Sequence, residues 1–510
     1  MPEKPNSIFQ AGDYKLQACE IISYRISAEG GPFRMDIKPI LISIQLEENL
    51  FHNSIIGKIQ VEDAQDVRTI LPITGLERLQ LKFSTPGLPG INAVANDGHP
   101  FYIYAIDNVA PDTDSPRAQI YNILFCSKES YYNDIRKVSK AYTGRLEDAV
   151  EDIFINRNYL NSTKQLFIEP TRTNTKIVIP NQRPMDAIRM IGNSCVSGLY
   201  QNAGYLFYET PIGYHFRSYE SLLAIGGSTV RPSKWKYQPQ IQNVRADEKP
   251  GQLGGKTPAP GTKDVIKDLH SVHSWTFEKP VDMLQNFKAG AYANRFIEYD
   301  PFFKLITTND YDYDDDFYNH FHTEHSDGYK TAVKKPLPYA NFDDTNRPLS
   351  QEPLQKVVLK SNTSKVHDSQ EFPSHYQTTQ KRISQAQFMR KNILSINAPG
   401  NSLIHAGDII TFDMPLYRPI GDNLPAKSSP HYAGRYLVIA VEHTIAIEAG
   451  KYEILIKAVK DSVRKAFQAE ADSFPLASPL YVGHNIYDED KKILNTLAKR
   501  DKRGPGRGDR

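Results

Sequence analysis

Apolar and polar residues alternate along the first 130 residues with the period of two that is typical of half-buried β-strands. Within residues 56–63, for example, Lys58 and Gln60 fall on one face of the expected strand, and Ile59 and Val61 fall on the other. Runs of this kind, separated by short polar turns, occur at residues 14–26, 37–50, 54–64, 78–87, 100–109 and 118–129. The pattern predicts a β-barrel or a β-sandwich.

The period changes after about residue 130, where helical and strand patterns mix. We expect a helix with Thr143 as its N-cap, because apolar residues then recur at the spacing of one helix face. These residues are Leu146, Val150, Ile153 and Phe154. Two aromatic-rich strands should flank the turn at Pro211-Ile212-Gly213. The middle of the chain is therefore expected to be mixed α and β.

Residues 176–195 place an apolar strand, the polar step Asn181-Gln182-Arg183 and a helix opened by Pro184 next to one another. Proline suits the first helical turn, where its missing N–H costs nothing, and it pushes Arg183 toward extended geometry. Met185 and Ile188 give the helix an apolar face. The step is predicted to be a fixed corner of a scaffold, not a ligand-binding turn.

Strand patterns resume in the C-terminal half of the chain. Residues 247–264 are rich in Pro, Gly and Lys and are predicted to form an exposed loop. Residues 307–375 are polar, aromatic and poor in aliphatic side chains, which predicts an insertion that packs against neighbours more than against itself. A helix is expected at residues 375–391. Strands are expected at 392–402, 403–415, 433–447 and 451–463.

The composition is that of a globular protein, with 40% hydrophobic and 24% charged residues among 510. This length suggests roughly three or four domains. We predict a β-rich α+β fold in which two β-barrel domains flank a mixed α/β middle domain. The expected domains are residues 1–130 (first barrel), 131–234 (middle), 235–465 (second barrel, with the insertion at 307–375) and 466–510 (basic C-terminal extension).

The formal net charge of +2 provides no global field that would steer the chain onto nucleic acid or an anionic membrane. Cys19, Cys126 and Cys195 are too few and too scattered for a disulfide framework or a paired zinc motif, so we expect reduced core residues. The first residues show no secretory signal, and no window approaches ~18 consecutive apolar residues. We expect the chain to fold in a cytoplasm, without a membrane-spanning helix.

An acidic segment is the most tempting metal site. Asp310, Asp312 and Asp314 have the first spacings of a calcium loop, but Asp315 stands where a glycine is needed and Phe321 where the closing glutamate should be. A solvated acidic loop is the preferred interpretation.

The nearby histidines His320, His322 and His325 could bind a transition metal, but no further ligand follows at a suitable spacing. We expect surface or interface histidines. Metal binding by residues 310–325 stays an open alternative.

Known catalytic motifs are matched only in part or not at all. Residues 192–198 approach a nucleophile elbow, but Val196 replaces its second glycine, and no nucleotide-binding glycine loop occurs. Glycosidase carboxylates need no sequence spacing and stay an alternative. Arg507-Gly508-Asp509 is interpreted as a chance match to an adhesion tripeptide. The basic tail could contact nucleic acid or an acidic partner. We assign no catalytic, cofactor-binding or metal-binding residue and expect no enzyme and no cofactor.

Several motifs occur in one order near the C-terminus. A turn at Pro399-Gly400-Asn401-Ser402 leads into a strand with Gly407-Asp408, and a Gly434-Arg435-Tyr436-x-Val438 strand then ends near His443. This series resembles the second tube-like domain of the baseplate hub proteins of contractile phage tails. The step at 179–184 and the segment 290–304 resemble the middle domain and a strand of the same hubs. The resemblance is discontinuous and extends over about residues 10–465.

The resemblance implies a non-enzymatic virion protein of the tail baseplate. Such hubs are homotrimers in which two similar barrels per chain form a pseudo-sixfold ring, joining a hexameric tail tube to a trimeric central spike. The implied partners are the spike, the tube or tube-initiator protein, the surrounding wedge proteins and a tape-measure protein, with DNA only as passing cargo and no membrane insertion.

Two alternatives stay open at this stage: the hub of a related contractile secretion device, and a tail-associated cell-wall hydrolase. The insertion at 307–375 and the basic tail exceed what the hub core requires, and the resemblance assigns no role to either.

Overall fold

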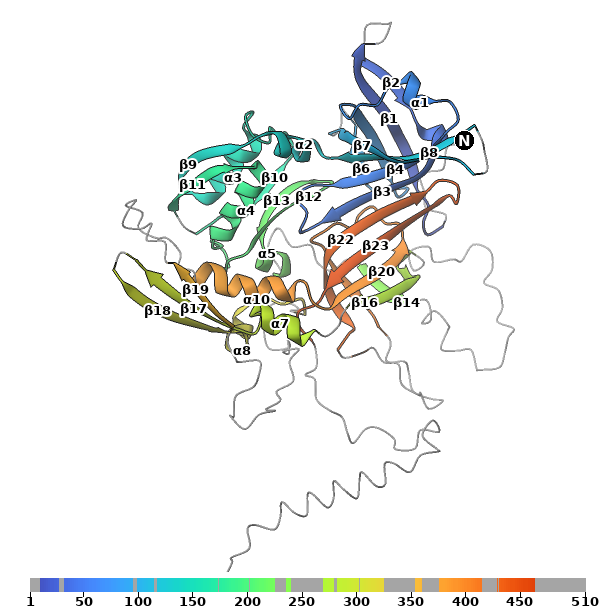
Figure 1. Ribbon diagram of the computed structural model, residues 1–510. Coiled ribbons are helices and arrows are strands. Elements are labelled where there is room, and N and C mark those ends of the chain that lie inside the picture. The colour runs from blue at the N-terminus through green and yellow to red at the C-terminus, as the bar shows by residue number, and fades with distance from the viewer. Residues whose placement is uncertain are drawn as a thin grey trace, which may run out of the picture. The chain divides into compact units, whose positions relative to one another are not determined.

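The computed structural model describes the greater part of the chain (Figure 1). All of them lie in one compact unit that spans Met1–Ala466. The loop predicted at 247–264, His325 and the basic tail from 466 lie outside them. The described ranges are 10–26, 32–94, 99–113, 117–172, 174–200, 202–224, 235–239, 269–278, 282–301, 303–324, 354–359, 376–414, 429 and 431–463.

The N-terminal region is a series of antiparallel strands, and each of the predicted runs contains one. In β4, Ile59 and Val61 are buried while Lys58 and Gln60 are partly exposed, as the alternation predicts. The region contains β1 (Lys15–Ile26), β2 (Pro32–Asp36), a 3₁₀ turn (Lys38–Ile40), β3 (Leu41–Asn49), β4 (Ile56–Asp63), α1 (Val67–Ile70), β5 (Arg78–Ser84), β6 (Ile91–Ala93), β7 (Phe101–Pro111), β8 (Gln119–Cys126) and α2 (Lys128–Ile135).

The middle region mixes helices and small sheets around its own apolar core. Its helix α3 buries the predicted face, but Thr143 is not its N-cap: Thr143 lies in β9 and the helix begins after Arg145. The strand continues to the helix because β9 pairs with β11 along this length. The elements are β9 (Val138–Arg145), α3 (Leu146–Ile155), β10 (Leu166–Ile168), β11 (Asn174–Gln182), α4 (Pro184–Ser194), β12 (Tyr205–Thr210), β13 (Gly213–Ser218) and α5 (Tyr219–Leu223).

The C-terminal region contributes strands to the same large sheet as the N-terminal region. Its strand β22 pairs antiparallel with β3, and the sheet order there runs β21-β22-β3-β4 (Figure 1). The predicted β-rich α+β fold is therefore confirmed. The strands are β14 (Trp235–Pro239), β15 (Ser271–Val272), β16 (Ser274–Glu278), β20 (Ile393–Pro399), β21 (Ile409–Phe412), β22 (Gly434–Ala446) and β23 (Lys451–Val459).

One apolar core continues across this pairing. Ile44 of β3 lies directly opposite Ile445 of β22, and both side chains are fully buried. The same cluster includes Phe83 of β5 and Ile456 of β23. Burial of large apolar side chains on both sides of the pairing contributes roughly 1.5–3 kcal/mol per side chain. The N-terminal and C-terminal regions are thus joined by backbone pairing and by shared core.

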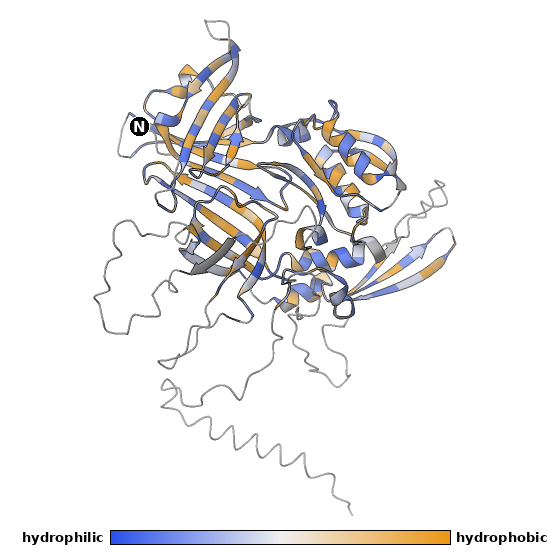
Figure 2. Ribbon diagram, turned by 180° about the vertical axis from the view of Figure 1, so that it is seen from behind, coloured by the Kyte–Doolittle hydropathy of each residue, from blue (hydrophilic) through white to orange (hydrophobic). Residues whose placement is uncertain are grey.

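A further part of the chain, which we call the side region, comprises the described residues between 282 and 391. Its three-stranded sheet has the order β18-β17-β19, and its strands carry both hydrophobic and hydrophilic residues (Figure 2). Tyr313 and Phe317 pack against Phe388, which lies beyond the predicted insertion. The elements are α7 (Met283–Ala289), β17 (Ala293–Asp300), β18 (Leu305–Asp312), α8 (Tyr313–Asp316), a 3₁₀ turn (Phe317–Asn319), β19 (Leu354–Leu359), a π-turn (Tyr376–Gln380) and α10 (Lys381–Phe388).

The cysteines behave as predicted. Cys19, Cys126 and Cys195 are free thiols buried at separate places in the core. Burial raises the pKa of each thiol. Among the described helices, none is long and apolar enough to cross a membrane.

Candidate functional site

The strand-to-helix step of the middle region is a fixed corner. Asn181 adopts a left-handed conformation with φ of 48°. Arg183 is extended, as expected before proline, and its guanidinium donates to Asp134 at 2.9 Å. The backbone N–H of Met185 donates to Asn133 Oδ1 at 2.8 Å. A residue of α2 therefore supplies an acceptor for one of the N–H groups that have no partner within the first turn of α4. The geometry agrees with the scaffold interpretation, although the partner from α2 could not be identified from the sequence.

A buried charged cluster crosses the junction between β3 and β22. Glu48 is 0% exposed, and its Oε1 lies 3.2 Å from His443 Nε2 and 3.3 Å from His405 Nδ1. The other nitrogen of His443 lies 2.7 Å from the hydroxyl of Tyr452. Burial alone would raise the pKa of Glu48, but the two histidines outweigh it and lower that pKa to about 2. We call this group the Glu48 cluster.

The sequence carries one local signal for the Glu48 cluster. Glu48 shares a face of β3 with Leu46 and Ile44, so a charge stands at a position where the alternation requires an apolar side chain. Buried charges are paired or hydrogen-bonded in native proteins. The partner His443 was singled out by its motif, whereas its contact with Glu48 depends on a strand pairing that the sequence does not reveal.

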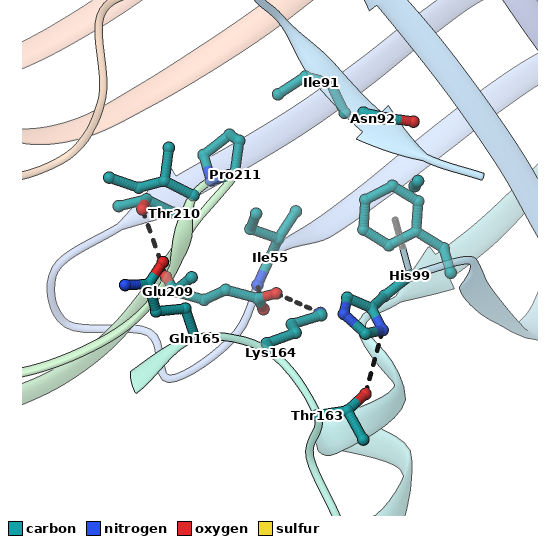
Figure 3. Close-up of a pocket in the computed structure, with 14 residues that line it drawn as sticks. Ile55, Ile91, Asn92, His99, Thr163, Lys164, Gln165, Glu209, Thr210 and Pro211 are labelled. Carbon is teal, nitrogen blue, oxygen red and sulfur yellow. Dashed lines mark hydrogen bonds and ion pairs between the residues drawn. The ribbon is translucent and has the colours of Figure 1, made fainter. Parts of the chain in front are cut away.

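A second charged group lies beside a cavity of about 340 Å³ between the N-terminal and middle regions (Figure 3). Lys164 and Glu209 point toward one another there, with Nζ and Oε1 2.6 Å apart, and Lys164 also donates to Glu129 at 3.1 Å. The side chains of Glu129 and Glu209 are 1% and 2% exposed. The ammonium group of Lys164 thus pairs with two buried carboxylates.

The remaining oxygens of these carboxylates accept hydrogen bonds from other segments. Glu209 accepts from the backbone N–H of Ile55 at 2.9 Å and from the hydroxyl of Tyr214 at 3.0 Å. Glu129 accepts from Ser162 at 2.6 Å. Each carboxylate oxygen therefore has a donor, and the group holds the β12–β13 hairpin against the segment that enters β4.

The pKa values in this group move in different directions. Burial and the nearby charge of Glu129 raise the pKa of Glu209, although Lys164 opposes the shift. For Glu129, the Lys164 charge and the Ser162 hydrogen bond outweigh burial and lower the pKa. His99, which lines the same cavity, has its pKa lowered by burial. Because each carboxylate is saturated by fixed donors, this geometry suits a structural joint better than an acid–base pair.

Two of the histidines that were expected at a surface or an interface are buried. His320 and His322 are each 2% exposed. His320 lies between Glu220 at 2.8 Å and Asp316 at 2.7 Å, and His322 lies 2.8 Å from Asp461. For these two histidines the surface alternative is wrong, because Glu220 and Asp461, about 100 residues or more away in sequence, supply partners inside the fold.

These contacts also set the protonation of the residues involved. Burial opposes the charged form of His320, but hydrogen bonds and charges of Asp316 and Glu220 outweigh it and raise its pKa to about 8. For Asp461, burial is outweighed by His322, and the pKa is lowered to about 2. The two histidines tie the side region to α5 and to the end of the chain's described part by charge-assisted hydrogen bonds.

The acidic segment is not a loop. Asp310 and Asp312 lie in β18, and Asp314 lies in α8. Asp310 forms a two-pronged ion pair with Arg295, at 2.6 and 2.7 Å, instead of facing a metal. Among the described residues, no group of three or more His, Cys, Asp or Glu side chains is arranged to hold a metal ion.

The sequence matches no protein-family model and no curated protein. Solved structures do match it. The chain is similar to tail proteins. A tail protein from Neisseria meningitidis MC58 has 11% identity and a TM-score of 0.47, over 88% of this chain and 97% of that one. The 43 kDa tail protein of prophage MuSo2 from Shewanella oneidensis has 9% identity and a TM-score of 0.45, over 87% and 98%.

A third similar structure is the c3393 protein of E. coli, described as a component of the type VI secretion system. It has 10% identity and a TM-score of 0.36, over 89% of this chain and 78% of that one.

Proposed function

We propose that this chain is the structural hub of a contractile phage tail baseplate and is not an enzyme. In this proposal three copies form a ring that joins the hexameric tail tube to the trimeric central spike and surrounds part of the DNA channel. The virion baseplate is then its location, after assembly in the host cytoplasm. Its partners are the spike, the tube or tube-initiator protein, the wedge proteins and a tape-measure protein, and DNA passes only as cargo.

The pairing of β3 with β22 carries this proposal. It makes one continuous sheet from the N-terminal and C-terminal regions, with seven residue pairs between the strands. A ring built from two similar units per chain needs such a fixed connection between them. We also propose the predicted divisions at 130, 234 and 465 as the limits of these units, with 307–375 inserted into the second.

The motifs behind the resemblance occupy positions where the fold restricts the residue type. A side chain at Gly400 would overlap the ring of Tyr452, and one at Gly434 would overlap the carboxylate of Glu324. The N–H of Gly400 also donates to the carbonyl of Tyr452 at 2.8 Å. The packing of β20, β22 and β23 thus requires glycine at these two positions. This requirement supports the resemblance on which the proposal draws.

Analytical ultracentrifugation tests the proposal directly. The purified chain, alone or mixed with its spike protein, should sediment as a trimer of three times 57.8 kDa and appear by electron microscopy as a ring with a central hole. A chain that stays monomeric with the spike protein present would refute the hub. Clearing of peptidoglycan by the purified chain in a zymogram would instead support the cell-wall hydrolase.

A further inference from the structure

Another cavity, of about 430 Å³, lies where α4, β12 and α10 meet the turn that follows β3. Its walls combine aromatic side chains with polar ones. The ring-bearing residues that line it are Phe51, Tyr205, Phe207, Phe216 and Tyr219. A cavity of this volume is in the range that accommodates a small molecule or a few side chains, and it is too small for a nucleic-acid duplex.

Three arginines line this cavity: Arg189 on α4, Arg382 on α10, and Arg390 just after α10. No aspartate or glutamate is among the described residues that line it. None of these guanidinium groups forms an ion pair with a carboxylate in the part of the chain that the structure describes. Of the three, Arg382 is half-buried, and elsewhere in the same fold the little-exposed cations Lys164 and Lys460 have carboxylates within 3.1 Å.

Most of the donors on these arginines are unused by the protein. Arg382 donates one N–H to the carbonyl of Asn193 at 3.3 Å, and the guanidinium of Arg390 lies 5.1 Å from the centre of the Phe51 ring. A guanidinium carries five N–H donors, so most of this capacity is available to a ligand. Burial also lowers the pKa of Arg382, as expected for a cation that lacks a counter-charge.

The backbone is shaped to bring these side chains together. Gly204 has φ of +110°, and a Cβ there would lie 2.6 Å from the ring of Tyr219 and 3.5 Å from Cγ of Arg382. Only glycine allows this backbone conformation and this close approach. The ring of Tyr219 can therefore pack at the cavity wall only because residue 204 has no side chain, and the stem of Arg382 lies next to it at an ordinary contact distance.

We propose that this cavity binds carboxylate groups carried next to an aromatic or apolar side chain. Carboxylates pair with guanidinium groups through two parallel hydrogen bonds, and the aromatic walls would bury the apolar part of the ligand. Arg382 and Arg390 are eight positions apart, which is roughly 12 Å along a helix, so they suit two separate carboxylates better than one phosphate. The site is independent of the proposed hub function.

Fluorescence anisotropy with a labelled peptide tests the site. The peptide acetyl-Glu-Phe-Phe-Glu-amide should bind the full chain at low salt at least about tenfold more tightly than its Gln-for-Glu counterpart. The double variant Arg189→Gln/Arg390→Gln should lose about tenfold or more in affinity. Both of these side chains are exposed, so the variant should fold, which circular dichroism checks.

Arg157→Gln is the matched control, because Arg157 is exposed and does not line the cavity. It should bind the peptide like the unchanged chain. Equal binding of the two peptides, an unchanged affinity in the double variant, or stronger competition by inorganic phosphate than by the acidic peptide would each overturn the proposal.

Citrate identifies the source of the carboxylates. If citrate displaces the peptide at matched concentration, a free small carboxylate is the supported ligand. If it does not, acidic side chains of a partner protein are supported.

Discussion

The junction of β3 with β22 and the junction of the side region with the rest of the chain both join segments far apart in sequence, by different means. At the first, seven residue pairs of a continuous sheet surround the Glu48 cluster with apolar core. At the second, His320 and His322 reach Glu220 and Asp461 through single side-chain contacts. The first junction therefore combines strand pairing and apolar burial with charged side chains, whereas these contacts of the second are made by side chains alone.

The shared sheet also buries its apolar side chains more completely than the sheet of the side region does. Ile44 and Ile445 are fully buried between β3 and β22, whereas Ile306 of β18 and Val357 of β19 are 69% and 71% exposed. Apolar burial is the largest favourable term in folding, so the side region obtains less stability from its own sheet. We expect it to open at a lower free energy than the shared sheet.

The largest effect should come from Glu48→Gln. The substitution leaves His405 and His443 buried without their carboxylate, and breaking a buried charge pair typically costs about 3–5 kcal/mol. Urea unfolding, with hydrogen exchange read in β22, measures this loss. Glu47→Gln is the matched control, because Glu47 is the neighbour in β3 with 35% of its side chain exposed, and it should cost less than about 1 kcal/mol. Equal losses would show that the Glu48 cluster does not stabilise the junction.

Acid should weaken the same junction. The pKa of Glu48 is lowered to about 2 from 4.5, so its contribution is present above about pH 4.5 and is lost as the pH falls through 2. A shift of this size corresponds to roughly 3 kcal/mol. Hydrogen exchange in β22, followed from pH 5 downward, should accelerate in the unchanged chain more than in Glu48→Gln. Parallel pH profiles in the two proteins would contradict this assignment.

Alkali should weaken the junction of the side region. The pKa of His320 is raised to about 8 from 6.5, so its contribution is complete below about pH 6.5 and is lost as the pH rises through 8. The expected loss is roughly 2 kcal/mol. Exchange in α8 should accelerate between pH 6.5 and 9 after correction for intrinsic rates. His320→Gln should remove this pH dependence, and its persistence in that variant would point to another group.

The smallest effect should come from Arg295→Gln. The ion pair of Arg295 with Asp310 has good geometry, but the aspartate side chain is 56% exposed and the pair is accessible to salt. We expect a loss of less than about 1 kcal/mol at low ionic strength and almost none in 0.5 M salt. Thermal melts at both ionic strengths measure it, and a salt-independent loss of 2 kcal/mol or more would mean that the pair supports the side region far more than its exposure suggests.

The periodicity of apolar residues predicted which face of an element is buried, but it did not predict which strands pair. It placed Ile59 and Val61 of β4 and Ile153 of α3 correctly, because alternation and helical spacing report which side of an element is buried. It did not reveal that β22 pairs with β3, since many strands of the chain have the same alternation and pairing depends on the whole fold.

The charged residues of the site were missed for the same reason. Glu48, Lys164 and His320 acquire their roles only when distant segments meet. Read without those segments, His320 resembles an exposed residue of an acidic stretch. The out-of-phase position of Glu48 in β3 was the available local signal, and it indicates a buried charge without naming its partner.

The β3–β22 pairing also has a consequence for synthesis. When β3 leaves the ribosome, its partner lies almost 400 positions downstream, which is tens of seconds at about 5–20 residues per second. During that interval the N-terminal strands present an open edge that could pair with another nascent chain. Contacts of such long sequence separation also slow folding. A chain whose strand partner is made this late would therefore benefit from a chaperone, or from an early neighbour, that covers this edge until the C-terminal strands arrive.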